Sequence, residues 1–101
     1  MVKHLVMFKL ADEAEGNNKR ENARIIKTKL EDLKSVIPVI KKIVVNINDE
    51  KASQDNYDIV LDSEFNTMED LNAYIVHPEH RKVGEFIVKV KTERAAVDYE
   101  F

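Results

Sequence analysis

Residues 2–10 read VKHLVMFKL, and this segment alternates between the two faces of an extended chain. One face carries Val2, His4, Val6, Phe8 and Leu10. Leu5 and Met7 lie on the other face, so the middle of the segment is apolar on both sides. Such a segment is typical of an interior strand that is covered on each face of its sheet. It therefore predicts a central strand.

A helix is predicted to follow this strand. Asn17 and Asn18 can cap it, and Glu21 stands three residues after Asn18, which is the capping-box spacing. Apolar residues then recur at steps of three and four, as on one side of an amphipathic helix: Ala23, Ile26, Leu30, Leu33 and Ile37. Pro38 is predicted to end the helix, because a residue before proline is forced out of the helical region.

The remaining chain predicts three more strands and a second helical segment. The strands are expected at about 39–47, at 57–65 and at 95–101 (AAVDYEF). Asn66 and Glu69 show the capping-box spacing at the start of the second helical segment, and Pro78 is expected to break or kink it. Its last part has apolar residues at helical spacing: Val83, Phe86, Ile87 and Val90.

The order strand, helix, strand, strand, helix, strand is that of the α+β, ferredoxin-like split βαββαβ unit. Right-handed crossovers then predict one antiparallel sheet, in the strand order 4-1-3-2, with both helices on one face. Leu5 and Met7 on the opposite face would stay uncovered. We therefore expect a single domain, residues 1–101, that forms a homodimer with its sheets face to face, a dimeric α+β barrel.

Composition excludes several classes of protein. The chain of 101 residues has 16 basic and 19 acidic residues, a formal charge of −3, which predicts no affinity for nucleic acid. It has no cysteine, so disulfides, thiolate metal sites and a cysteine nucleophile are excluded. The apolar run Leu5–Phe8 is far shorter than the roughly 20 residues of a membrane span, and it lacks the features of a signal peptide. We expect a cytoplasmic protein with no membrane partner.

Histidines are the most informative candidates for chemistry. His77 and His80 bracket Pro78 in the run YIVHPEH, and His4 lies in the first strand. Histidine suits general-base catalysis because its ordinary pKa lies close to neutrality. In the expected sheet, Asp98 lies opposite His4 and can hold its ring. Tyr74 precedes His80 by six residues. The predicted site therefore consists of four residues: His80, Tyr74, His4 and Asp98.

Each of these residues also has a structural interpretation. His4 can be a hydrogen-bonded strand histidine, and His77 a surface or capping residue at the helix break. Tyr74 can be buried with its hydroxyl bonded locally, and Asp98 can form an ion pair at a strand end. A zinc site is disfavoured, because Pro78 interrupts the His77–His80 spacing and no fourth ligand is apparent. No metal or organic cofactor is expected.

The opening VKHLVMFKL, the segment YDIVLDSEFNTMEDLNAYIVHPEH and the close AAVDYEF resemble the stress-responsive A/B barrel (Dabb) domain family. The resemblance covers residues 2–101, and it implies the same dimeric α+β barrel. Among the members, the chain resembles olivetolic acid cyclase, which closes the ring of a linear poly-β-keto thioester by an aldol step without a cofactor. That resemblance implies His80 as the base, Tyr74 as its partner, and His4 with Asp98 as support. A pocket tyrosine of the cyclase corresponds to Leu30 here, so the substrate does not carry over.

Two classes of function stay open on this basis. The first is a cofactor-free, cyclase- or lyase-type enzyme whose small-molecule pocket uses His80 to remove a proton next to a carbonyl group. Its ligand would be a small apolar carbonyl compound. The second is a non-catalytic dimeric protein that is associated with stress or binds a ligand, as in family members without established catalysis. Haem or metal handling is a third possibility that rests only on the histidines.

Overall fold

The computed structural model describes all residues from 1 to 101. Its elements are β1 (Val2–Leu10), β2 (Glu13–Ala14), β3 (Asn17–Asn18), α1 (Lys19–Asp32), the 3-10 turn η1 (Leu33–Ser35), β4 (Lys42–Ile47), β5 (Ile59–Phe65), α2 (Met68–Val76), α3 (Pro78–Val90) and β6 (Lys91–Glu100). The expected split βαββαβ order is confirmed, with a short β2–β3 hairpin inserted before α1 and the second helix divided into α2 and α3.

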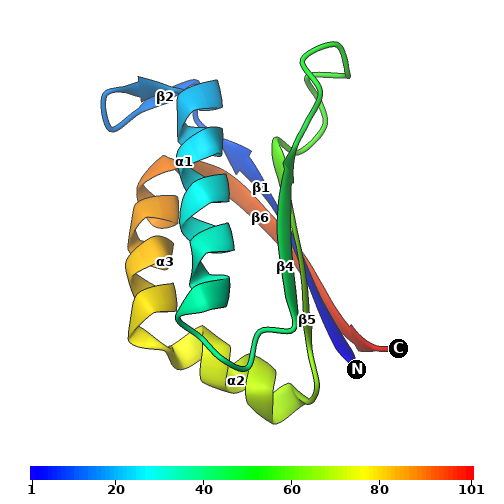
Figure 1. Ribbon diagram of the computed structural model, residues 1–101. Coiled ribbons are helices and arrows are strands. Elements are labelled where there is room, and N and C mark those ends of the chain that lie inside the picture. Colours follow the sequence, from blue (N-terminus) through cyan, green and yellow to red (C-terminus); the bar gives the residue numbers. More distant parts are fainter.

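The main sheet has four antiparallel strands in the order β4-β5-β1-β6, which is the predicted order. The helices α1 and α3 lie on one face of it, and the opposite face carries no helix (Figure 1). Strand β1 lies inside the sheet, between β5 and β6. Its alternation is as expected, because Val2, His4, Val6, Phe8 and Leu10 are all buried under the helices. The core therefore fills the space between the helices and one sheet face.

The element boundaries differ from the sequence-based ones in several places. Helix α1 ends at Asp32 and is followed by the 3-10 turn η1, so the α-helix stops before Pro38, which was expected to end it. Strand β4 begins at Lys42 rather than near 39, because Ile37–Ile40 form a turn in which Ile40 N donates to Ile37 O at 3.2 Å. Strand β5 begins at Ile59 rather than at 57. Strand β6 begins at Lys91, directly after α3 and four residues earlier than expected.

Capping side chains fix where the helices begin. The predicted capping box of α1 is confirmed: Asn18 accepts from Glu21 N at 2.9 Å, and Asn18 N donates back to the Glu21 carboxylate. The cap predicted for α2 is wrong by one residue, because the Thr67 hydroxyl, not Asn66, accepts from Asp70 N at 3.1 Å. Thr67 competes well for this position because its hydroxyl oxygen is a good acceptor for exposed helix N–H groups.

The edge strand β4 is covered by side chains of α1. Val45 N donates to the Glu31 carboxylate at 3.0 Å, and Lys27 Nζ donates to Val45 O. Lys27 and Glu31 also pair with each other at 2.8 Å. Both backbone groups of Val45 that a further strand would need are therefore occupied. We call Lys27 and Glu31 the β4 edge cover.

The face of the sheet without helices, which we call the bare face, combines apolar and charged side chains. Met7, Val97, Tyr99 and Phe101 are exposed there. Beside them, Lys3 bridges Asp62 at 2.7 Å and Glu64 at 2.8 Å. These hydrogen bonds raise the pKa of Lys3 and lower the pKa of both carboxyls, so all three groups stay charged.

No helix of the chain is long and apolar enough to span a membrane.

Candidate functional site

A cavity of about 190 Å³ lies between the helices and the covered face of the sheet. Strands β1, β5 and β6 and helices α1 and α3 contribute to its wall, which consists of His4, Val6, Phe8, Leu30, Leu61, His80, Gly84, Ile87, Val88, Lys91 and Arg94. Most of the wall is apolar, and the polar groups are two histidines and two cations. The volume is below the roughly 300–1,000 Å³ of drug-sized ligand sites, so the cavity suits a small molecule.

Gly84 in the interior of α3 helps to keep this cavity open. A Cβ added at this position would meet no atom within 4 Å. Glycine inside a helix costs about 1 kcal/mol relative to alanine. Since alanine would fit without a clash, packing does not demand glycine here. The missing side chain leaves its volume to the cavity, at a cost in helix stability.

His80 contributes an imidazole with a free lone pair. It lies in the first turn of α3, where Nδ1 lies 2.9 Å from the carbonyl oxygen of Ile75 in α2. A carbonyl oxygen only accepts, so Nδ1 donates and the neutral ring keeps its lone pair on Nε2. Burial lowers the pKa of His80 below its ordinary value of 6.5. The ring is therefore neutral at pH 7 and able to accept a proton.

His4 and Asp98 are in contact, as the strand pairing expected from the sequence predicted. They are directly opposite in the β1–β6 ladder, and His4 Nδ1 lies 2.5 Å from Asp98 Oδ1. The carboxylate accepts, so His4 Nδ1 carries the proton of this hydrogen bond and Nε2 is the other ring nitrogen. His4 is only 5% exposed and lines the cavity. Asp98 therefore fixes the orientation of a cavity-lining ring.

Tyr74 is buried, as its structural interpretation stated. Its side chain is fully buried, with ring centroids 4.4 Å from His80 and 6.2 Å from His4. It does not line the cavity. Its hydroxyl is the one buried side-chain polar atom in the chain without a hydrogen-bond partner, so the local bond expected for it is absent. Burial raises the pKa of Tyr74, and the hydroxyl keeps its proton.

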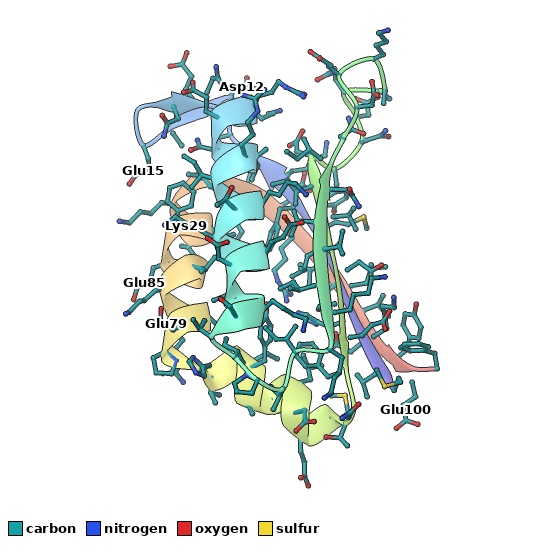
Figure 2. The ribbon with its side chains drawn as sticks, in the orientation of Figure 1. Asp12, Glu15, Lys29, Glu79, Glu85 and Glu100 are labelled. Atoms are coloured by element: carbon teal, nitrogen blue, oxygen red, sulfur yellow. The ribbon has the colours of Figure 1, made fainter.

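The structure thus gathers all four predicted residues, and it separates His77 from them. His77 Nδ1 accepts from Glu79 N at 3.1 Å and caps α3, as its structural interpretation predicted. On the outer surface of α3, Glu79 and Glu85 project away from the sheet (Figure 2). No group of three or more His, Cys, Asp or Glu side chains is arranged to hold a metal ion.

Sequence-based reasoning missed Lys91 and Arg94, which line the cavity from β6. Arg94 could have been found, because it shares the parity of Asp98 and hence its face of the strand. Lys91 has the opposite parity. Its place on the same face depends on an irregularity in the β1–β6 register that the sequence does not signal.

A split βαββαβ sheet that is covered by helices on one face only defines the class of ferredoxin-like α+β proteins. Within this class, the chain belongs to the Dabb family: the model of the Stress responsive A/B Barrel Domain matches residues 2–101. This confirms the resemblance noted from the sequence.

Two relatives have appreciable sequence identity. The stress-response A/B barrel domain-containing protein DABB1 of Arabidopsis thaliana is 29% identical over 99 residues, and the match covers 98% of this chain. The chain spans about half, 46%, of the length of that curated relative. A dimeric protein of unknown function and ferredoxin-like fold from Bacteroides fragilis is 39% identical with a TM-score of 0.88, over 99% of this chain and 95% of that one.

A hydroxynitrile lyase from Passiflora edulis has a TM-score of 0.75 over 97% of this chain and 90% of that one. Its identity is 13%, so this likeness concerns the fold alone.

Proposed function

We propose that the cavity binds a small apolar carbonyl compound and that His80 removes a proton from the carbon next to the carbonyl group. The observation that carries the proposal is the hydrogen bond from His80 Nδ1 to Ile75 O, because it leaves an unprotonated Nε2 on a neutral, half-buried ring at the cavity wall. The lowered pKa of His80 supports the same protonation state.

In the proposed step an N–H bond and a C=C bond form, and a C–H bond and the π bond of the carbonyl group break. The His80 Nε2 lone pair takes the proton, the C–H electron pair becomes the C=C bond of an enolate, and the carbonyl oxygen becomes an oxyanion. A donor near that oxygen would lower the barrier. Tyr74 is the proposed donor, and His4, held by Asp98, would orient the substrate or relay the proton. The partnerless Tyr74 hydroxyl supports its part, since the centroid of its ring lies 4.4 Å from that of His80, which lines the cavity.

Proton abstraction can be tested without knowing the natural substrate. We expect the wild-type protein to accelerate deuterium exchange next to the carbonyl of heptan-2-one in D₂O, as followed by NMR. His80→Ala should reduce the protein-dependent rate by about 10²-fold or more, since a positioned base contributes about 10²–10⁴-fold. The rate should rise with pH to a plateau, with its midpoint below 6.5, because neutral His80 is the active form and its pKa is lowered.

A matched control is His77→Asn, which removes the other histidine of the HPEH run and keeps a good helix cap. It should exchange like wild type. Gly84→Leu should block exchange by filling the cavity, with both histidines retained. Exchange by His80→Ala at the wild-type rate would contradict the proposal. Heptan-2-one binding without any exchange would favour the non-catalytic ligand-binding alternative.

We further propose that the chain forms a homodimer through its bare face. Exposed Val97, Tyr99 and Phe101 on that face support it, since a second copy would take them out of water. The Bacteroides fragilis protein, described as dimeric, gives further support at 39% identity.

A further inference from the structure

We propose that the ligand of the cavity carries a compact negative charge, held by Lys91 and Arg94. This inference rests on the proposed function and narrows its substrate class to apolar carbonyl compounds with an anionic group.

A β-bulge brings the two cations to the same side of β6. In a regular strand, residues three apart point to opposite faces. In the β1–β6 ladder, however, Phe8 pairs with Arg94 and Lys9 with Glu93, while Leu10 pairs with Lys91. Thr92 is therefore an extra residue that has no partner in β1. Because Phe8 and Leu10 share the covered face, Arg94 and Lys91 opposite them also lie on that face.

Both cations are free to meet a ligand. Each lines the cavity together with His80, and neither forms an ion pair with an acidic side chain of the chain. No acidic residue lines the cavity. By contrast, Lys3 and Lys27 are each paired with a carboxylate. The cavity wall therefore carries two positive charges without a counter-charge.

Both charges lie on the edge strand β6. The other strands and α1 contribute Val6, Leu30 and Leu61 to the wall, and these side chains would contact a hydrocarbon part. An arginine guanidinium matches the oxygens of a carboxylate or a phosphate in a bidentate manner, and a lysine adds a point charge. A ligand with an anionic head, a carbonyl group near His80 and a short apolar body fits this distribution.

Titration calorimetry at low salt with octanoate and octanamide tests the inference, since these probes differ mainly in charge. Octanoate should bind the wild-type protein at least about tenfold more tightly, and added salt should reduce that advantage. Lys91→Gln and Arg94→Gln should each weaken octanoate binding about two- to fivefold, as expected for partly exposed charges, and the double variant should bring it to the level of octanamide.

Arg24→Gln and Lys51→Gln are matched controls, because they remove exposed cations that lie outside the cavity. They should leave both affinities unchanged. A parallel titration with hexyl phosphate tells whether a carboxylate or a phosphate ester is preferred. Any of three results would overturn the inference. Octanoate and octanamide could bind equally well, octanoate could fail to bind, or the double variant could bind octanoate with wild-type affinity.

The two proposals fail separately. His80→Ala with wild-type exchange would overturn the proposed function and leave the octanoate titration as it stands. Equal affinity for octanoate and octanamide would overturn the proposal that the ligand is an anion. It would not change the result of the deuterium-exchange assay.

Discussion

The buried Tyr74 hydroxyl lowers the stability of the folded chain. It is fully buried among the rings of Phe65, His80 and His4, and it has no acceptor. Burying a polar group without a partner costs about 1–3 kcal/mol. A group that merely stabilised the core would not need this oxygen, so its presence is better explained by a ligand or a reacting oxygen than by packing.

Tyr74→Phe should therefore stabilise the protein. It should also lower the rate of deuterium exchange into heptan-2-one. We expect a gain of about 1 kcal/mol in the free energy of unfolding, or about 4–8 °C in Tm, because the variant removes an unsatisfied group and keeps the ring. Thermal denaturation by circular dichroism measures it. Tyr57→Phe, at a half-buried tyrosine, is the control and should change Tm little. A loss of 1 kcal/mol or more would show that the hydroxyl has a partner in the folded protein.

At this scale, the sequence allowed only part of the site to be predicted. Counting register from the two terminal strands was enough to place Asp98 opposite His4. The capping of α3 by His77 also followed from its position before Pro78. The missing partner of the Tyr74 hydroxyl and the place of Lys91 did not follow. The first depends on how the helices pack, and the second depends on a bulge with no local signature.

The contact between α1 and strand β4 belongs to the scale of elements. Partial burial raises the pKa of Glu31, but the hydrogen bonds from Lys27 and Val45 outweigh it, and the pKa is lower than the ordinary 4.5. A carboxyl with a lowered pKa in the folded state stabilises the fold above its unfolded pKa. That contribution is lost as the pH falls from about 4.5 through the folded pKa.

Glu31→Ala should destabilise the protein by about 1.5 kcal/mol at pH 7, since it removes a charged hydrogen bond to Val45 N and leaves Lys27 without its partner. Urea denaturation measures the change. Asp32→Ala is the control, because Asp32 is an exposed neighbour on α1 whose side chain caps nothing. The difference between wild type and Glu31→Ala should shrink below pH 4.5. An equal effect of the two variants at pH 7 would contradict a role of the edge cover.

Elements were easier to predict than their ends. Alternation in β1 and the Asn18–Glu21 capping box are local patterns, and both were correct. Several boundaries were wrong. The Thr67 hydroxyl caps α2 in place of Asn66, the turn Ile37–Ile40 makes β4 begin later, and β6 continues directly from α3 through polar residues that show no alternation.

At the scale of the whole molecule, the uncovered face of the sheet bears on how two copies assemble. Helices cover one face of the sheet, and the other is bare (Figure 1). Val97 lies on that bare face opposite Leu5 and is 51% exposed. In a dimer with its sheets face to face, its surroundings would be apolar side chains of both copies.

Val97→Lys should convert the proposed dimer into a monomer. An unpaired charge at such an interface costs about 3 kcal/mol or more, which raises the dimer Kd at least about 100-fold. Sedimentation velocity measures the state. Val36→Lys is a closely matched control, because Val36 is also 51% exposed but follows η1, in the connection between helix and sheet. A wild-type monomer, or a Val97→Lys dimer of unchanged Kd, would contradict the homodimer.

The side chains of Lys27 and Glu31 over Val45 also affect whether many copies of the chain can join through the edges of their sheets. A strand at the margin of a sheet that offers free N–H and C=O groups is a template on which other chains can polymerise, and a sheet with two such margins can grow from both. Here Lys27 and Glu31 occupy the middle of one margin from within the same molecule. The β4 margin is therefore interrupted at its centre, which opposes growth from that side, and concentrated solutions should stay free of thioflavin-positive material until Glu31 is removed.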